Sequence, residues 1–310
     1  MRIEYHRTLV ADHVRNTAFA EALAAVIEPG KTTVADIGAG SGLLGLIASK
    51  LGARDVFLYE TAEVAGVAAR VLKANRARNC HLFPCHSTEM QDPPRVDVVV
   101  SETLGNYALE ENIIETLNDA RERHLKPGGT IIPQRIAQFV APVIAGRIHH
   151  ELMAWDRIGH GLDFSLARTM SLNNVYVRSL EASELLEPAG KQWDLIDLTR
   201  QARSNRKGEA NWKVARPTTV HGLAVWWTLD LTADVRLSTA PGAPRTHWEQ
   251  LYFPLLEPIS LGAGETLTAN IRSRSSEEAG THLAWTVGHL DARGKQLARQ
   301  ALDLDKGFLP

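Results

Sequence analysis

The stretch Val34-Ala35-Asp36-Ile37-Gly38-Ala39-Gly40-Ser41-Gly42 decides the fold of this chain. Its first half is an apolar segment typical of a buried strand, and residues 43–51, which follow it, are typical of an apolar helix. Glycines at 38, 40 and 42 allow a tight turn and let a ligand approach bare backbone. The helix that follows offers unpaired N–H groups. This sequence therefore predicts a strand, glycine turn and helix built around a ligand.

A carboxylate follows at the end of the next predicted strand. Glu60 lies twenty residues after Gly40, where a carboxylate can accept both hydrogen bonds of a ribose diol. The dinucleotide fingerprint places its third glycine at position 43, which is Leu43 here. The spacing therefore disfavours NAD and favours a nucleoside ligand that has no pyrophosphate.

Strand-like and helix-like segments alternate on both sides of this turn. The predicted strands are residues 33–37, 56–59, 81–83, 96–100 and 130–132, and the predicted helices are residues 43–51, 62–77 and 111–125. This alternation is typical of a parallel sheet with crossover helices. We therefore expect a Rossmann-like α/β domain over residues 1–133.

After Pro133 the pattern changes to strands. Residues 221–231 place an apolar side chain at every second position from Leu223 to Leu231, as a strand with one buried face requires. Turn signals such as Pro241-Gly242 and Arg293-Gly294 divide the rest into short segments. We therefore expect a second, mostly antiparallel, β-barrel-like domain over residues 134–310.

One helix-like segment interrupts this second half. Its apolar residues follow helical spacings of three and four: Ile148, Leu152, Trp155, Ile158 and Leu162. A helix with so narrow an apolar stripe can pack against another helix or subunit. It can also be an ordinary amphipathic helix that packs against the core of its own domain. The pattern alone leaves both open.

Charge and composition exclude several classes of protein. The 310 residues carry 34 Lys plus Arg and 36 Asp plus Glu, a formal charge of −2, so no nucleic-acid or membrane partner is expected and a cationic partner must be recognised locally. Cys80 and Cys85 indicate a reducing compartment, and without a distant second pair they predict no metal site. No apolar run reaches about 18 residues. We expect a cytoplasmic protein.

The loop after the fourth predicted strand is acidic. Glu102 and Glu111 flank a turn that contains Gly105, so both carboxylates can meet around one cation. A guanidinium fits such a site because two carboxylates can grip its planar fork of donors at once. Solvated acids in a loop and in the first turn of a helix are the alternative that spacing alone leaves open.

Together these residues resemble the protein arginine methyltransferases, a family of class I S-adenosylmethionine enzymes with a C-terminal β-barrel and a helical dimerisation arm. Four motifs carry the resemblance, which covers nearly the whole chain: His6 with Asp12-His13-Val14-Arg15, residues 34–42 with Glu60, residues 101–111, and Thr246-His247-Trp248. Many methyltransferases share the glycine turn. Paired glutamates nine residues apart, followed much later by Thr-His-Trp, are specific to the family.

The resemblance implies a role for each matching residue. The implied residues around S-adenosylmethionine are His6, Arg15, Asp36, Gly38, Gly40, Glu60, Thr88 and Glu89, with Arg15 on the methionyl carboxylate, Glu60 on the ribose, and Glu89, with Thr88 beside it, on the adenine. The implied catalytic residues are Glu102 and Glu111, which clamp the guanidinium, and the pair Asp12 and His247. The resemblance also implies a homodimer formed through an arm at about residues 147–173.

Two departures from the family bear on the lid and the acceptor. Family members carry an aromatic-rich helix ahead of the residue matching His6, and this sequence starts five residues before it, so we expect a shortened or absent lid. In the acidic loop, Thr103-Leu104 and Asn106 replace the family's Trp-Met and a later aromatic residue. We expect arginine in a protein or peptide as the acceptor. The alternatives are a free guanidino or amino metabolite such as arginine, and a cofactor-binding regulatory protein without turnover.

Overall fold

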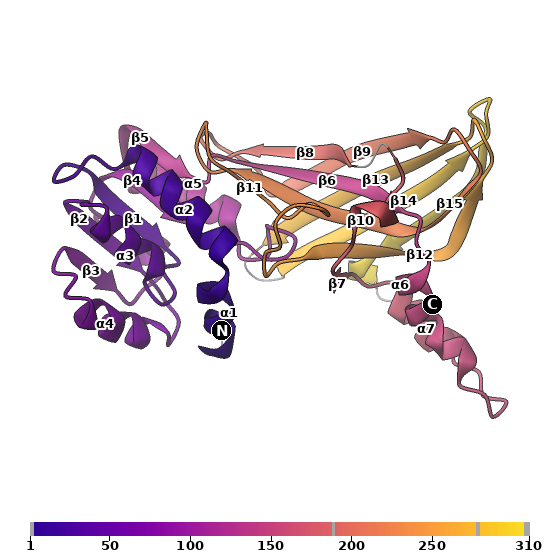
Figure 1. Cartoon of the computed structure of the whole chain (residues 1–310), viewed down its shortest axis with the longest axis horizontal. Helices are drawn as coiled ribbons and strands as arrows, with labels where there is room; N and C mark the ends of the chain where they lie inside the picture. Colours follow the sequence, from indigo (N-terminus) through magenta and orange to yellow (C-terminus); the bar gives the residue numbers. More distant parts are fainter. Residues whose placement is uncertain (1–2, 188–189, 277–279, 307–310) are drawn as a thin grey trace.

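The computed structural model describes residues 3–187, 190–276 and 280–306 of the chain. A part built on a parallel sheet and a barrel-like part built on antiparallel sheets lie side by side along the long axis of the molecule (Figure 1). Among the residues described, no helix has the length and apolar character needed to cross a membrane.

A five-stranded parallel sheet forms the centre of the N-terminal part, with the strand order β3-β2-β1-β4-β5. Its strands are β1 (Thr33–Ile37), β2 (Asp55–Tyr59), β3 (Cys80–Phe83), β4 (Val96–Ser101) and β5 (Leu125–Ile132). All five predicted strands are confirmed, although β5 begins five residues earlier than predicted. The strand order reverses between β1 and β4, and ligands of open parallel sheets bind at such a reversal, beyond the carboxyl ends of the strands.

Five helices and one short turn accompany this sheet. They are α1 (Ile3–Ala11), α2 (His13–Val26), α3 (Leu43–Lys50), α4 (Ala65–Ala74), α5 (Ile113–Arg123) and the 3₁₀ turn η1 (Ser87–Glu89). The three predicted helices are confirmed with shorter ends, whereas α1 and α2 were not predicted. Asp12 separates these two helices because its carboxylate caps α2, accepting a hydrogen bond of 2.9 Å from the backbone N–H of Arg15.

Two antiparallel sheets form the barrel-like part. One has the order β7-β12-β10-β6-β8, with β11 paired to β10, and the other has the order β15-β14-β13-β9. The strands are β6 (Arg135–Val143), β7 (Tyr176–Arg178), β8 (Lys191–Asp197), β9 (Asn205–Lys213), β10 (Thr218–Asp230), β11 (Arg236–Ser238), β12 (Gln250–Leu261), β13 (Thr266–Ser276), β14 (Gly280–Leu290) and β15 (Gln296–Asp303). The 3₁₀ turns η3 (Ala182–Glu184) and η4 (Leu304–Lys306) complete this part.

Strand β10 has apolar packing on both faces. The face predicted from the sequence, from Leu223 to Leu231, is buried in the main core and is confirmed. The opposite face is buried too, because Ala224 and Trp226 belong to a second apolar cluster with Ile148 of the arm. The arm is therefore seated on the sheet that its own chain forms.

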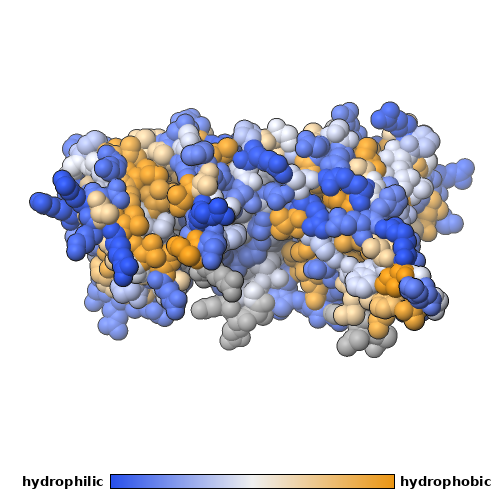
Figure 2. Space-filling view, turned by 60° about the horizontal axis from the view of Figure 1, so that its bottom comes forward, coloured by the Kyte–Doolittle hydropathy of each residue, from blue (hydrophilic) through white to orange (hydrophobic). Residues whose placement is uncertain are grey.

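Residues 147–173 form an arm that projects from the barrel-like part (Figure 1). It consists of α6 (Arg147–Leu152), the 3₁₀ turn η2 (Met153–Arg157) and α7 (Ser165–Leu172). The expectation of one continuous helix is wrong, because Gly159, His160 and Gly161 all adopt positive φ and end the helical path. The exposed apolar side chains of the arm are Trp155, Ile158, Leu162, Phe164, Leu166 and Met170. Figure 2 shows hydrophobic residues where the arm comes forward at the lower right.

Three histidine rings lie close together at the base of the arm. His149 on α6 is 3% exposed, and its ring centroid lies 5.9 Å from that of His221 on β10, which lies 6.4 Å from that of His150. Burial lowers the pKa of His149, and the neighbouring His221 lowers it further. The folded protein keeps His149 neutral, whereas the unfolded chain takes up a proton below about pH 6.5.

We expect the free energy of unfolding to fall as the pH drops below about 6.5, because the unfolded state then binds more protons. The contribution of His149 to this fall is at most about 1.4 kcal/mol per pH unit. The variant His149→Gln lacks this proton uptake, so its stability should depend less on pH between about 7 and 5.5. Urea unfolding at both pH values measures the difference, with the exposed His150→Gln as the control. Equal pH dependence in His149→Gln and the unmodified protein would contradict the prediction.

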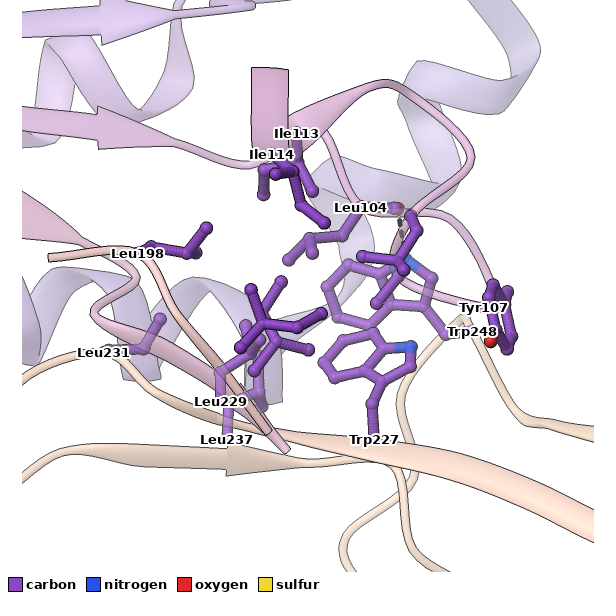
Figure 3. Packing of buried hydrophobic residues seen from close by; sticks show 14 of the residues in the cluster. Leu104, Tyr107, Ile113, Ile114, Leu198, Trp227, Leu229, Leu231, Leu237 and Trp248 are labelled. Carbon is purple, nitrogen blue, oxygen red and sulfur yellow. Dashed lines mark hydrogen bonds between the residues drawn. The ribbon is translucent and has the colours of Figure 1, made fainter. Parts of the chain in front are cut away.

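A shared apolar core holds the two parts together. Trp227 of the barrel and Trp248 pack edge to face at 4.8 Å, and both are almost fully buried. They lie against Leu104 and Tyr107 of the loop after β4 and against Ile113 of α5 (Figure 3). The Trp248 indole N–H also donates to the backbone oxygen of Leu104 at 2.8 Å. The loop after β4 is thus fixed by the barrel as well as by its own sheet.

Candidate functional site

A cavity of about 280 Å³ lies at the carboxyl ends of β1 and β4. Its walls come from α1, from the turn after β1, from the end of β2 and from the loops after β3 and β4. The predicted site residues that line it are His6, Arg15, Asp36, Gly38, Gly40, Glu60, Glu102 and Glu111. Its volume is close to the lower end of the range for small-molecule sites, about 300 Å³.

The glycine turn forms the floor of the cavity. Gly38, Gly40 and Gly42 have φ of +71°, +55° and +84°, which side chains rarely adopt. A Cβ on Gly38 would overlap the methyl group of Thr103, and a Cβ on Gly40 would lie 3.4 Å from the ring of His6. The turn therefore requires glycine for its backbone conformation and, at Gly38, for space.

Replacing Gly38 by Ala is expected to raise the Kd for a nucleoside ligand at least about tenfold, because the positive φ and the overlap with Thr103 must shift the turn. Isothermal titration with S-adenosylhomocysteine measures this. The matched control is Gly66→Ala on α4, where a Cβ meets no atom within 4 Å and alanine favours the helix. Equal affinity in Gly38→Ala and Gly66→Ala would refute the prediction.

The carboxylates of Asp36 in β1 and Glu60 after β2 bind backbone N–H groups of the glycine turn and of the helix that follows it. Glu60 accepts a hydrogen bond from the backbone N–H of Gly40 at 2.7 Å and another from that of Ala62 at 2.8 Å. Each Glu60 oxygen keeps a further lone pair for a ligand hydroxyl. Asp36 is buried and accepts from the Gly45 N–H of α3 at 2.8 Å, and burial raises its pKa to about 7. Asp36 therefore joins β1 to α3, while Glu60 remains able to bind a diol.

The loop after β3 places different residues on the cavity wall from those expected. Cys85, His86 and Ser87 line the cavity, whereas Thr88 and Glu89 do not. The Glu89 carboxylate accepts from the backbone N–H of His86 at 3.3 Å and closes the short turn η1. Within the described part of the chain, Cys85, His86 and Ser87 are thus the residues of this loop that line the cavity. A short loop without apolar periodicity gives no signal that separates neighbouring positions.

Helix α1 closes one side of the cavity, although the sequence predicted no helix there. Tyr5, His6, Leu9 and Val10 all line the cavity from this helix. Burial lowers the pKa of His6, while Glu60 opposes that shift. The Nε2 atom of His6 is buried and has no hydrogen-bond partner among the residues described. An unsatisfied ring nitrogen against the glycine turn is a free contact for a ligand.

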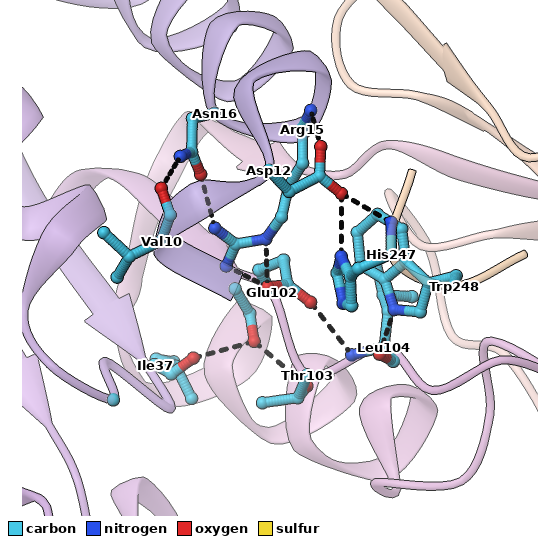
Figure 4. A network of polar contacts seen from close by, with 12 residues as sticks. Val10, Asp12, Arg15, Asn16, Ile37, Glu102, Thr103, Leu104, His247 and Trp248 are labelled. Carbon is cyan, nitrogen blue, oxygen red and sulfur yellow. Dashed lines mark hydrogen bonds and ion pairs between the residues drawn. The ribbon is translucent and has the colours of Figure 1, made fainter. Parts of the chain in front are cut away.

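Arg15 and Glu102 form a buried ion pair at the other end of the cavity (Figure 4). The Arg15 Nε donates to Glu102 Oε2 at 2.5 Å, and a terminal guanidinium nitrogen donates to the same oxygen. Both side chains are less than one-tenth exposed. Burial raises the pKa of Glu102, and Arg15 opposes that shift. The two residues expected at cofactor and acceptor are thus in direct contact.

Glu111 is the second carboxylate at this end. It lines the cavity, and within the described residues no hydrogen bond or ion pair engages its side chain. Its pKa is raised by partial burial and then by the negative charges of Glu102 and Glu60. The cavity therefore ends at an uncompensated negative charge, which a cationic ligand would neutralise.

Asp12 and His247 connect the N-terminal segment to the barrel beside this acidic end (Figure 4). Asp12 Oδ2 accepts from the backbone N–H of His247 at 2.8 Å and lies 2.7 Å from its ring Nδ1. Burial alone would raise the pKa of Asp12, but the hydrogen bonds from His247 and Arg15 outweigh it and lower the pKa. The other ring nitrogen of His247 is buried without a hydrogen-bond partner among the described residues. The predicted Asp–His contact is therefore present, outside the residues that line the cavity.

Cys80 and Cys85 are free thiols, and over residues 3–187, 190–276 and 280–306 no three His, Cys, Asp or Glu side chains are arranged to hold a metal ion. Burial raises the pKa of Cys80, so its thiol stays protonated.

Comparisons with known proteins identify the family to which the chain belongs. Residues 134–289 match the arginine methyltransferase oligomerization subdomain, and residues 13–149 match the ribosomal protein L11 methyltransferase family. The chain is 31% identical to the arginine N(omega)-methyltransferase of Streptomyces achromogenes subsp. streptozoticus, over 86% of this chain and 75% of that protein. It is 28% identical to protein arginine N-methyltransferase 6 of Xenopus tropicalis, over 96% of this chain and 92% of that protein.

Solved structures share the whole fold. The Trypanosoma brucei PRMT1 enzyme–prozyme heterotetrameric complex with AdoHcy superposes with a TM-score of 0.87 at 24% identity, covering 98% of both chains. Arabidopsis thaliana protein arginine methyltransferase 10 superposes with a TM-score of 0.82 at 22% identity, again over 98% of both chains. The expected fold, a Rossmann-like domain followed by an antiparallel barrel-like domain with an arm, is thereby confirmed. By its matched subdomain and its relatives, the chain belongs to the protein arginine methyltransferase family.

Proposed function

We propose that this chain is an S-adenosylmethionine-dependent N-methyltransferase that methylates a guanidino nitrogen of arginine. The observation that carries the proposal is the unpaired Glu111 beside Glu102 at the end of a cavity whose floor is a glycine turn. Family membership supports the reaction class, because relatives across most of the chain's length are named arginine methyltransferases.

The cavity's own residues fit S-adenosylmethionine, which supplies a methyl group on a positively charged sulfur when bound. Glu60 would hold the ribose with its remaining lone pairs, and His86 and Ser87 would face the adenine. Arg15 would hold the methionyl carboxylate, and His6 Nε2 would gain the partner that it lacks. We assign the two carboxylates beyond Arg15 to the acceptor.

Glu102 and Glu111 would fix the plane of the acceptor guanidinium and draw its positive charge toward the nitrogens that they bind. The third nitrogen is then richer in electrons where the methyl group arrives, and positioning is the main demand of an in-line displacement. Free guanidinium keeps its proton at neutral pH, so the proton leaves after transfer. Glu111 can accept it, and His247 with Asp12 offers a second route.

The acceptor is arginine within a protein or peptide in this proposal, with free arginine or a similar metabolite as the second candidate. Thr103 and Asn106 in the acidic loop favour the second, and so does the name of the Streptomyces relative, which specifies arginine without protein. Methyl-labelled cofactor incubated with an arginine-rich peptide, free arginine and a cell extract separates the two. Label on peptide supports the first candidate and label on arginine alone the second. Cofactor binding without any label would support a regulatory protein instead.

We also propose that the arm makes the chain a homodimer. The matched oligomerization subdomain includes the arm. The arm also exposes a group of apolar side chains, which is typical of a surface that is buried in a subunit interface. Light scattering on the purified protein should give about twice the mass of one chain, 34.1 kDa. A monomer at micromolar concentration would contradict the dimer.

The free thiols support a reducing, cytoplasmic location, which cell fractionation tests.

A further inference from the structure

Tyr5 is the aromatic ring at the acidic end of the cavity. It lies on α1 and lines the cavity, and its ring stands edge-on to His247 with centroids 6.4 Å apart. The residue is 42% exposed, and among the described residues no hydrogen bond engages its hydroxyl. The ring is therefore held by the helix while one side remains accessible from the cavity.

The carboxylates near Tyr5 indicate which end of the cavity it lines. Burial raises the pKa of Tyr5, and the negative charges of Glu111, Glu102 and Glu110 raise it further, in that order. The other phenol that lines the cavity, Tyr59, is 1% exposed and stacks on Phe83 at 5.3 Å, at the end of β2 where Glu60 follows. Tyr5 is thus the phenol beside the proposed acceptor, and Tyr59 the one beside the nucleoside.

The ring of the acidic loop, Tyr107, is buried in the core between the two parts and does not line the cavity. Asn106 is turned toward the barrel, where its amide donates to the backbone oxygen of Trp248 and its backbone oxygen accepts from the Trp227 indole at 3.1 Å. The hydroxyl of Thr103 lies 3.2 Å from that of Ser101, and its methyl group faces the glycine turn. Neither side chain is therefore available to cover the face of a bound guanidinium.

We propose that Tyr5 is a specificity-determining residue that covers one face of the acceptor guanidinium while Glu102 and Glu111 bind its edge. This inference rests on the proposed function. A planar cation held edge-on by carboxylates leaves its two faces free, and an aromatic ring on one face attracts the charge and excludes water. Tyr5 comes from the N-terminal helix and the carboxylates come from the loop after β4, so the acceptor pocket is completed only when α1 lies against that loop.

Kinetics of Tyr5→Leu and Tyr5→Phe test this with arginine as the acceptor. Leucine keeps an apolar side chain without a ring, so the acceptor KM should rise about 3- to 30-fold, whereas phenylalanine should stay within about twofold of the unmodified protein. The Kd for S-adenosylhomocysteine should remain unchanged in both, which shows that α1 with His6 is still in place.

Three other results would overturn the inference. An unchanged acceptor KM in Tyr5→Leu would show that the ring does not contribute to acceptor binding. An equal rise of the acceptor KM in Tyr5→Phe would show that the hydroxyl, and not the ring, binds the acceptor. If the unmodified protein turns over no guanidine and binds none with S-adenosylhomocysteine present, the proposed function itself fails and takes this inference with it. If the unmodified protein methylates arginine and Tyr5→Leu has the same acceptor KM, the inference about Tyr5 fails while the proposed function stands.

Discussion

Glu102→Gln is expected to lower kcat about 100- to 1,000-fold while the Kd for S-adenosylhomocysteine changes little. The Glu102 side chain is 5% exposed and carries the charge that would draw the guanidinium's positive charge away from the reacting nitrogen. Glutamine keeps the shape and one acceptor oxygen but loses the charge. Arg15 remains available for the cofactor carboxylate, so cofactor binding should persist.

Single-turnover measurements with labelled cofactor test this prediction, with Glu28→Gln at an exposed position as the control. Glu111→Gln should cause a loss of similar size, because the two carboxylates bind one planar group. Residues that act as a unit are not additive, so the double variant should be little slower than either single variant. A kcat within twofold of the unmodified protein in Glu102→Gln would remove Glu102 from the mechanism.

The sequence was sufficient for the local features of the site. The glycine turn and Glu60 are encoded within about thirty residues, where strand and helix signals are strong, and the structure brings them together at one cavity. The paired glutamates lie in one loop and likewise reach the same cavity. Such features follow from spacing along the chain, because neighbouring elements fix their geometry.

Spacing along the chain does not predict contacts between distant segments, and the contact of Asp12 with His247 was expected only from the family resemblance. Arg15 and Glu102 are 87 residues apart, and nothing in either segment signals that they pair. Helix α1 was missed for a similar reason. Its charged and apolar residues mix without a clear seam, and tertiary contacts with the cavity decide which of them are buried. The prediction of one continuous helix in the arm failed at Gly159 and Gly161, because their positive φ ends the helix although the apolar spacing continues.

Arg15→Met is expected to lower the free energy of unfolding by about 3 kcal/mol and to raise the Kd for S-adenosylhomocysteine about 10- to 100-fold. Methionine keeps much of the volume but leaves the buried Glu102 carboxylate without its partner. The proposed cofactor carboxylate loses its cation at the same time. Urea unfolding measures the first effect and titration calorimetry the second.

The double variant Arg15→Met with Glu102→Gln separates these two effects. Removing the uncompensated carboxylate should restore much of the lost stability, because the cost comes from one buried charge and not from the missing contact. The affinity for S-adenosylhomocysteine should stay low, because no cation returns to the site. If the double variant recovers affinity together with stability, Arg15 acts only by folding the site, and the cofactor carboxylate must be bound elsewhere. If stability and affinity both stay low, the Arg15 side chain stabilises the fold through contacts other than Glu102, such as its hydrogen bond to Asn16.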